Sequence, residues 1–431
     1  MAYTTIDQIK KLYHSVYHIA DDTIIDVILA ITIGAKLKGD PIWLMIIGAP
    51  SAGKSELINM VSGVDYVHQV SNLTENSFLS GMSRSDGKEK SLLTKIGKRG
   101  MIIMKDYTSI LSMKHDKREV IAGQMREIFD GKITKKTGNG TDPSWEGKIN
   151  FIGGSTDKIF SAEGESAGMG RRNVNYVMPV EDDEARMAMG RTSRKNTNDI
   201  DIKRLQIIEA VKEFVEYKTV DMPDDLPQVD DEISEQLLEL ANFVTRVRTP
   251  TERDFKGMMK TVLFAEMPMR MSNQIHQLAQ YFMYMNEDKL LPHHLEILFK
   301  ISLDSIPKSK RLALEYLSQY DNMTTKAFAH VIKYPTDTAR EWLEDLNVLG
   351  ICSRQTVKET QTDIWKIDDK YRHIMLKYGK LTRIEEPLRL DSDVITGKTP
   401  YDYDDSDDID PGWAKEVNER NTQLFNDMGG E

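Results

Sequence analysis

Eight residues near the start of the chain, Gly48 to Ser55, have the types and spacing that bind phosphate. They read Gly-Ala-Pro-Ser-Ala-Gly-Lys-Ser and fit the pattern G-x-x-x-x-G-K-[ST] in full. In this pattern the backbone N–H groups cradle phosphate oxygens, the lysine neutralises their charge, and the hydroxyl after it ligates Mg²⁺. An apolar run, residues 42–47, precedes the loop, and a helical pattern follows it. We therefore expect ATP and Mg²⁺ to be bound by Gly48, Ala49, Pro50, Ser51, Ala52, Gly53, Lys54, Ser55 and Glu56.

A phosphate loop that supports hydrolysis also needs a carboxylate at the tip of a neighbouring strand, to hold Mg²⁺ and orient water. The second apolar strand, residues 100–106, ends in Asp106 and supplies one carboxylate. Lys105 stands immediately before it, where such strands usually carry another acid. We expect Asp106 to hold Mg²⁺ or to poise the attacking water. One carboxylate can hardly do both fully, which leaves the rate of hydrolysis open.

Two pairs of polar residues follow further along the chain. Ser155 and Thr156 come after an apolar strand, residues 149–152, and either hydroxyl is able to hydrogen-bond a γ-phosphate or water. A simple loop cap is the equal alternative. Arg171 and Arg172 stand before another apolar strand. An arginine at a subunit edge can reach the γ-phosphate of a neighbour, whereas a solvated basic turn is the plainer interpretation.

Three lysines, Lys132, Lys135 and Lys136, fall where two β-like segments flank a Gly/Asn turn. A β-ribbon that carries lysines binds a phosphate backbone without sequence preference and with a strong dependence on salt. The stretch therefore predicts contact with DNA. The alternative is a charged, exposed hairpin that only keeps the protein soluble.

The order of elements predicts four parts. Strands alternate with helices around the glycine loop, which indicates an α/β nucleotide-binding core with a parallel sheet over residues 1–200. Residues 201–305 are rich in Met and Leu and predict an all-α lid. Residues 306–380 show three helices and a hairpin, the order of a winged helix. Residues 381–431 predict a disordered acidic tail, because residue 385 onward has 14 acidic and 4 basic residues.

The third helix of the predicted winged helix, residues 336–347, is the one expected to read DNA, yet it is not basic. Its cation is Arg340, and its carboxylates are Asp337, Glu341, Glu344 and Asp345. A helix that reads DNA normally carries more Lys or Arg at its exposed start. Phosphate contacts are still open to Lys326, Lys333 and Lys358. A protein-binding role, or orientation of the lid, is an equal alternative.

The composition favours the cytoplasm. Cys352 is the single cysteine, which excludes a disulfide framework and favours a reducing compartment. No apolar run is long enough to span a membrane, and the first residues lack the apolar segment of a signal peptide. We expect no membrane contact. We also expect no zinc site, because no ligand set with Cys352 is formed by His14, His18, His293 and His294.

Four stretches in this order resemble the AAA+ ATPases and together extend over roughly residues 20–290. They read GDPIWLMIIGAPSAGKSE, MIIMKDYTSIL, REIFDGKITKKTG and GMGRRNVNYVMP. The similarity is greatest to the branch with a β-hairpin before its sensor-one strand, which includes minichromosome-maintenance-like helicases. Within that branch it is sharpest to ATPases encoded by phages and mobile elements.

The resemblance implies roles for the residues of the core. Residues 48–55 match the Walker A loop, and Asp106 matches the second acid of Walker B. Lys105 departs from the first Walker B acid, which puts full metal binding in question. Thr156 matches the polar sensor-one residue, with Ser155 as the other register.

The resemblance also implies a subunit interface. Arg172 matches the arginine finger that acts in trans, with Arg171 next to it. In the lid, AEMPMRMSNQIHQLAQ resembles the sensor-two helix and places Arg270 over the γ-phosphate. Because the finger comes from a neighbour, a homo-oligomeric ring is implied, with a hexamer as the expected size. The hairpin lysines would line its central pore.

These features predict a ring-forming ATPase that moves on or remodels single-stranded or forked DNA. We expect a replicative helicase or initiator of a phage or mobile element, and a role in defence is also open. One alternative is a protein remodeller or helicase loader that docks through the winged helix or the acidic tail. A weakly hydrolysing nucleotide switch is another, suggested by Lys105. A transcription activator ranks last, because TENSFLSGMSRSDG lacks a Gly-Ala-Phe-Thr pore loop.

Overall fold

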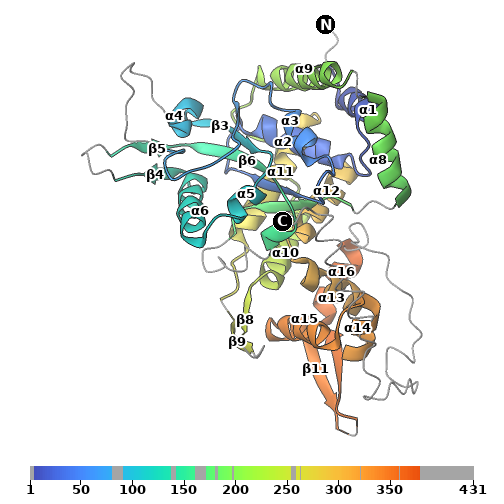
Figure 1. Cartoon of the computed structure of the whole chain (residues 1–431). Coiled ribbons are helices and arrows are strands. Elements are labelled where there is room, and N and C mark those ends of the chain that lie inside the picture. The colour runs from blue at the N-terminus through green and yellow to red at the C-terminus, as the bar shows by residue number, and fades with distance from the viewer. Residues whose placement is uncertain are drawn as a thin grey trace. The chain divides into compact units, whose positions relative to one another are not determined.

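The structure of the chain is a computed structural model (Figure 1). It describes residues 4–378, apart from residues 80–90, 137–141, 161–170, 180–182, 197–198, 254–258, 263, 321 and 359. The chain forms two compact units. One contains residues 1–242 and 268–305, and the other contains residues 243–267 and 306–431.

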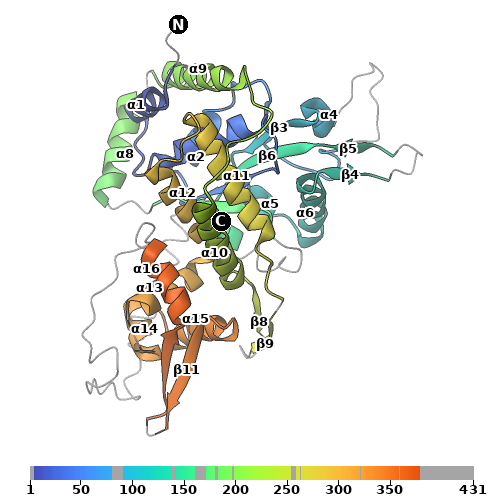
Figure 2. The same cartoon turned by 180° about the vertical axis from the view of Figure 1, so that it is seen from behind.

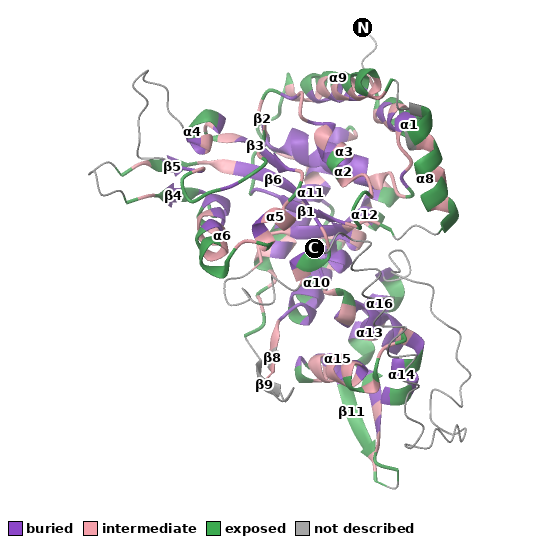
Figure 3. Cartoon of the chain, viewed as in Figure 1, coloured by how far each residue is buried: buried purple, intermediate pink, exposed green. Residues whose placement is uncertain are grey.

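A five-stranded parallel sheet forms the core of the first unit, in the order β2-β3-β6-β1-β7. Its strands are β1 (Trp43–Ile47), β2 (Val67–Gln69), β3 (Arg99–Met104), β6 (Lys148–Ser155) and β7 (Val174–Val177). Strand β1 is buried throughout, and β3 and β6 are buried after their first residue (Figure 3), as parallel strands covered on both faces must be. The predicted α/β core with a parallel sheet is confirmed. The sequence does not indicate β2, which lies in a mostly polar stretch.

Helices cover this sheet (Figures 1 and 2). They are α1 (Ile6–Val16), α2 (Thr23–Gly34), α3 (Lys54–Asn59), α4 (Leu92–Ile96), α5 (Thr108–Leu111), α6 (His115–Phe129), α8 (Asp183–Asn196), α9 (Ile200–Thr219), α11 (Met269–Met285) and α12 (Pro292–Asp304); α10 (Asp231–Val247) contains the boundary between the two units. Over the described part of the chain, no helix is both long and apolar enough to cross a membrane.

The two faces of the sheet can be followed on β6. Phe151 points into an apolar core with Trp43 and with side chains of α6. The adjacent residue Asn150 points to the other face, where its Nδ2 donates to the carbonyl of Ile31 in α2 at 2.8 Å. Helix α11 packs beside α2 (Figure 2), so closely that a Cβ on Gly34 would lie 2.1 Å from the ring of Tyr281. A glycine is therefore required at this contact.

The edge strand β7 has its outer side closed by α12. The N–H of Val177 donates to Asp304 Oδ2 at 2.8 Å, and Lys300 Nζ donates to the carbonyl of Val177 at 2.7 Å. The N–H of Asn175 donates to Ser305 Oγ at 3.1 Å. Side chains from the end of α12 thus satisfy backbone groups that an edge strand would otherwise expose.

A separate antiparallel hairpin consists of β4 (Lys132–Thr134) and β5 (Ser144–Glu146), as the sequence predicts. Ile133 and Trp145 are paired in register and buried, while Lys132 and Thr134 are exposed. The alternation follows from the two-residue period of a strand. The tip, at the Gly/Asn turn, lies outside the described residues.

The second unit has three helices followed by a hairpin, as expected, with β10 and α16 in addition. Its elements are α13 (Lys308–Gln319), β10 (Met323–Thr324), α14 (Thr325–Ile332), α15 (Thr336–Val348), β11 (Cys352–Val357), β12 (Thr362–Ile367) and α16 (Asp369–Tyr378). The strands form an antiparallel sheet in the order β10-β12-β11. Residues 381–431, predicted as an acidic tail, lie outside the described residues.

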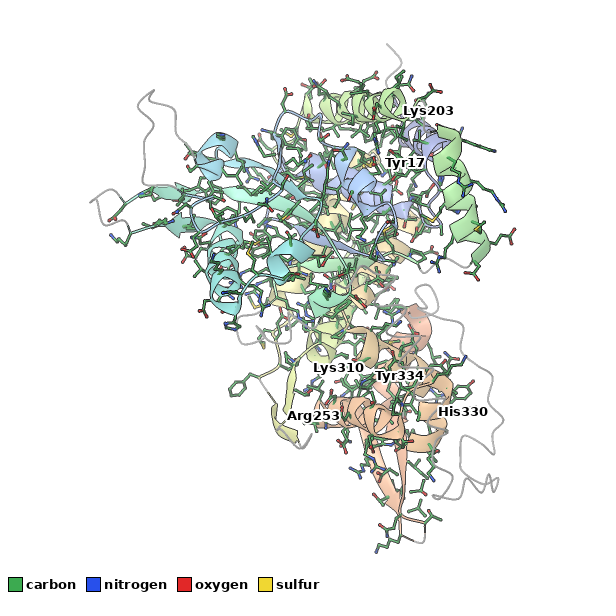
Figure 4. The ribbon with its side chains drawn as sticks, viewed as in Figure 1. Tyr17, Lys203, Arg253, Lys310, His330 and Tyr334 are labelled. Atoms are coloured by element: carbon green, nitrogen blue, oxygen red, sulfur yellow. The ribbon has the colours of Figure 1, made fainter. Side chains whose placement is uncertain are left out.

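The segment predicted as an all-α lid, residues 201–305, is divided between the two units and contains an antiparallel strand pair. The pair is β8 (Thr251–Arg253) with β9 (Met259–Val262), so the all-α prediction is wrong here. Strands this short leave little periodic signal among Met-rich helical neighbours. Contacts distant in sequence fix β8 instead: Arg253 donates to Glu344 at 3.1 Å and to Asp345 at 2.7 Å (Figure 4).

Candidate phosphate-binding site

The carboxyl ends of β1, β3 and β6 meet at one edge of the parallel sheet. In register, Ile47 lies beside Ser155, and Met104 lies beside Gly153. The loops that leave these strands are joined through their backbones. The N–H of Gly48 donates to the carbonyl of Ser155 at 3.2 Å, and the N–H of Tyr107 donates to the carbonyl of Gly154 at 2.7 Å. The fold therefore brings three of the predicted site segments together.

Two glycines make this arrangement possible. A Cβ on Gly154 would lie 2.5 Å from the carbonyl oxygen of Lys105, so a side chain there would push β3 and β6 apart. Gly53 has a φ of 86°, in the left-handed region that glycine adopts at little cost. The loop turns through this residue directly into α3, which begins at Lys54.

Lys54 is folded back over the loop. Its Nζ donates to the carbonyls of Gly48 at 2.7 Å and Ala49 at 2.6 Å. Burial lowers the pKa of Lys54 to about 8, and the negative charge of Asp106 opposes this shift. The ammonium group is thus held between the loop that would carry phosphate and the carboxylate on the next loop.

A chain of hydrogen bonds links Asp106 to Thr156. The N–H of Thr108 donates to Asp106 Oδ1 at 3.0 Å, and the N–H of Thr156 donates to Thr108 Oγ1 at 3.3 Å. Thr108 is not among the site residues that the sequence predicts. An aspartate two residues before a threonine does signal a turn in which the carboxylate accepts a backbone N–H.

The two candidate hydroxyls after β6 differ in their surroundings. Ser155 is buried, and its Oγ donates to the carbonyl of Thr156 at 3.1 Å. Thr156 Oγ1 is also buried, but it has no hydrogen-bond partner among the described residues. Buried hydroxyls are rarely left in that state. Thr156 therefore offers a polar atom suited to a phosphate oxygen or a water. Of the two candidate hydroxyls, the surroundings favour Thr156 over Ser155 for that role.

The polar groups of the site match the needs of Mg²⁺ and a polyphosphate. Ser55 and Asp106 are both exposed and carry the oxygen atoms that Mg²⁺ prefers. Lys54 and the N–H groups of the loop are donors that suit phosphate. The donor set and the unpartnered Thr156 hydroxyl together fit bound Mg-ATP.

Glu56 is turned away from this set. Its carboxylate accepts from Arg204 in α9, at 2.6 Å from Nη2 to Oε1, and from the hydroxyl of Tyr17 at 2.7 Å. Tyr17 follows α1 and is labelled in Figure 4. The expectation that Glu56 binds nucleotide therefore does not match its contacts. Nothing in the sequence pairs Arg204 with Glu56, because they are 148 positions apart.

Arg171 and Arg172 precede β7. They therefore lie near the amino ends of the parallel strands, which we call the amino edge of the sheet, opposite the carboxyl ends where the loops of the candidate site meet. In register, Val174 at the start of β7 pairs with Leu44 near the start of β1. The Arg172 guanidinium, whose side chain is 13 % exposed, binds both carboxylate oxygens of Asp130 at 3.2 and 2.7 Å. This pair holds Arg172 against the end of α6.

Arg270 is placed beside these arginines. Its Nη1 donates to the carbonyl of Arg171 at 3.0 Å. The next turn of α11 contacts the start of β1, where the N–H of Trp43 donates to Gln274 Oε1 at 3.2 Å. Arg270 thus lies near the amino ends of the strands, and its expected role over the γ-phosphate stays a prediction. The way α11 packs on the sheet decides this position.

The hairpin lysines have partners of unequal strength. Lys136 pairs with Asp142, although its side chain is 83 % exposed. Lys135 Nζ donates to the carbonyl of Glu75 at 2.8 Å. Lys132 is exposed and lies opposite Glu146 on β5. The carboxylates on this ribbon offset part of the positive charge expected from the sequence.

Two acidic residues of α15, Glu344 and Asp345, have partners within the second unit. Arg253 of β8 binds Glu344 and Asp345, and Arg354 of β11 lies 3.6 Å from Glu344. Arg340 donates to Asp363 at 3.0 Å. Glu344 and Asp345 of α15 therefore bind neighbouring elements of their own chain.

A scan of protein-family models and a search of curated proteins find no match for this chain.

Proposed function

We propose that the chain binds and hydrolyses ATP at the carboxyl edge of its parallel sheet. The observation that carries this proposal is the link from Asp106 through Thr108 to Thr156, which ends at a buried hydroxyl without a partner among the described residues. This link sets a carboxylate and a free polar atom beside a loop whose sequence fits phosphate. Such a juxtaposition is what nucleotide hydrolysis requires.

Each residue has a task that follows from its chemistry. Lys54 and the loop N–H groups bind phosphate oxygens, and Ser55 with Asp106 would hold Mg²⁺. Bound Mg²⁺ supplies charge neutralisation of the phosphates. Asp106 and Thr156 orient the attacking water between them. Lys54 must leave the carbonyls of Gly48 and Ala49 to reach a phosphate, so nucleotide binding exchanges those two hydrogen bonds.

The direct test is Mg-dependent ATP turnover by the full chain. We expect phosphate release by the natural chain and none by Lys54→Ala, with thermal unfolding used to show that both are folded. A turnover rate equal in the two proteins would refute the proposal.

We further propose that the site is completed by a second copy of the chain in a ring, with a hexamer as the expected size. Arg172 and Arg270 lie toward the amino edge of the sheet and Lys54 at its carboxyl edge, so these arginines suit a neighbour's phosphates better than their own. An arginine supplied in this way contributes on the order of 1,000-fold to turnover.

Mixing two inactive variants tests this arrangement. Arg172→Ala retains its own carboxylate, and Asp106→Asn retains its arginine. If Arg172 acts in trans, equal mixtures regain turnover that neither variant shows alone. Mixtures as inactive as the separate proteins would refute the shared site.

The motor is proposed to act on DNA, as a helicase or initiator of the phage and mobile-element type that the sequence resembles. The exposed Lys132 and the weakly held Lys136 support this choice, as does the expected winged helix of residues 306–380. Strand displacement on a forked duplex, with Lys54→Ala as the control, tests it. Turnover that no DNA stimulates at any salt concentration would instead favour a protein remodeller or loader.

A second candidate is a slowly hydrolysing nucleotide switch. It is favoured by the single carboxylate at the end of β3, since Asp106 already accepts a hydrogen bond from Thr108 and Lys105 stands where another acid is usual. A strong rise in turnover in Lys105→Asp would show that the natural chain is a slowed ATPase. An unchanged or lower rate would argue against the switch.

A further inference from the structure

Three segments meet at Glu56, beside the phosphate loop but outside it. Arg204 of α9 contacts both carboxylate oxygens, at 2.6 Å from Nη2 to Oε1 and 3.1 Å from Nε to Oε2. The Tyr17 hydroxyl donates to Oε2 at 2.7 Å and accepts from Arg204 Nε at 3.0 Å. We call Tyr17, Glu56 and Arg204 the Glu56 clamp. It connects the end of α1 and the start of α9 to the first turn of α3.

Glu56 lies in the first turn of α3, where its carboxylate could reach the backbone of the phosphate loop. Glu56 is the third residue of α3, and the N-cap is Gly53, which has no side chain to cap the helix. A glutamate at the third position of a helix is able to turn back and accept the N–H of the N-cap residue. In this loop, that N–H is one of the donors intended for phosphate. A released Glu56 carboxylate would therefore compete with the nucleotide and repel its charge.

The clamp removes that competitor. A guanidinium bound to two oxygens of a carboxylate fixes both its position and its orientation. The hydroxyl of Tyr17 adds a third contact, and burial with the bond to Glu56 raises the pKa of Tyr17 to about 12, so the hydroxyl keeps its proton. Helix α9 carries Arg204 and is otherwise packed on α1 and α2, at a distance in sequence from the loop.

We propose that Arg204 and Tyr17 are positioning residues, which hold the Glu56 carboxylate away from the phosphate loop so that the placement of α9 sets the affinity for nucleotide. This inference rests on the proposed nucleotide site. It assigns to α9 a control over that site: while the clamp is closed the Glu56 carboxylate is kept from the Gly53 N–H, and when α9 moves away Glu56 accepts a hydrogen bond from it.

The test measures binding of a fluorescent ATP analogue with Mg²⁺ to the full chain. Arg204→Ala is expected to bind about tenfold more weakly, because one charge-assisted contact is lost and a carboxylate enters the loop. Arg204→Ala combined with Glu56→Gln is expected to regain most of that affinity, since the uncharged amide is a far weaker competitor. Arg204→Lys should lie between the natural chain and Arg204→Ala.

A matched control is available on the same helix. Lys212 lies 3.9 Å from Asp65 and 3.8 Å from Glu216, so Lys212→Ala also removes a cation from α9. It is expected to leave nucleotide affinity unchanged. If Arg204→Ala does not fold, Tyr17→Phe carries the test, because it keeps the ion pair: binding weakens about threefold and recovers with Glu56→Gln.

The outcomes separate this inference from the proposed function. Equal affinity in the natural chain and in Arg204→Ala overturns the clamp and leaves the nucleotide site standing. Equally weak binding by Arg204→Ala and its combination with Glu56→Gln overturns it too, since the clamp would then only support α9. If the natural chain binds no analogue, the proposed function fails and the inference fails with it.

Discussion

The carboxyl edge of the parallel sheet and the region around its amino edge differ in how their polar groups are engaged. At the carboxyl edge Asp106 and Ser55 are exposed, and the buried Thr156 Oγ1 has no partner in the described part of the chain. Toward the amino edge, Arg172 is bound by Asp130, and on the nearby hairpin Lys136 is bound by Asp142. Exposed or unpartnered polar groups can bind a ligand directly, whereas a side chain in an ion pair must first break that pair before it binds a ligand.

The pairs of the second region are themselves unequal. Lys136 and Asp142 are exposed enough that water competes for both, and such surface pairs contribute little. DNA phosphates could replace Asp142 at small cost. Arg172 is mostly buried and contacts both oxygens of Asp130, so its transfer to a neighbour's phosphate requires a conformational change. We therefore expect substitutions at the carboxyl edge to change ATP turnover or nucleotide binding strongly, and substitutions elsewhere to have smaller effects.

The largest effect is expected for Asp106→Asn. The amide cannot accept a proton or neutralise Mg²⁺, so ATP turnover should fall at least about 100-fold. Affinity for the ATP analogue should change much less, because phosphate binding depends on Lys54 and the loop. Steady-state turnover and a binding titration measure the two quantities. Full hydrolysis by this variant would show that Asp106 is not needed for turnover, and that the carboxyl edge is not more important for turnover than the amino edge.

The pH dependence of nucleotide binding is expected to follow Lys54. Since its pKa in the free chain is lowered to about 8, the ammonium form is complete below pH 7 and is lost as the pH rises above 8. Affinity for the ATP analogue should therefore fall by up to about fivefold from pH 8 to pH 9.

Lys54→Arg provides the control for this pH dependence, because a guanidinium stays charged over the same range. The variant should show a flat profile, whatever its absolute affinity. The same profile in both proteins would assign the titration to another group.

The Thr156 hydroxyl gives an intermediate effect. Thr156→Val keeps the shape of the side chain and removes a buried hydroxyl that has no hydrogen-bond partner among the described residues. Turnover should fall about tenfold, while the free energy of unfolding should not decrease, because no hydrogen bond within the described residues is lost. Ser155→Ala is the matched control and should lose stability rather than turnover. If Ser155→Ala loses turnover and Thr156→Val loses stability instead, Ser155 is the functional hydroxyl.

The smallest effects are expected on the hairpin. Lys132→Ala should weaken binding to single-stranded DNA a few-fold and lower its salt dependence by about one unit. Lys136→Ala should have less effect, since Asp142 already offsets its charge. Fluorescence anisotropy at several salt concentrations measures both. Equal losses in the two variants would show that the Lys136 pair opens freely on DNA.

Much of the first unit could be predicted because its signals are local. The glycine loop, the apolar strands β1, β3 and β6, and the acid at residue 106 are each visible in a short run of consecutive residues. Parallel strands also place their carboxyl ends together by geometry alone. The sequence does not show β2 or the pair β8–β9, because strands of three or four residues are too short for a two-residue period to stand out.

By itself, the sequence determined the chemistry that this chain carries: a loop fit for phosphate, one carboxylate after the second strand, and lysines on a hairpin. Only the tertiary structure decided which of these groups meet. It gives Ser155 Oγ a hydrogen-bond partner and leaves Thr156 Oγ1 with none among the described residues. Arg270 lies at the amino edge because α11 packs on the start of β1, and the Glu56 carboxylate binds Arg204. Each outcome depends on contacts between residues far apart in the chain, which no local pattern encodes.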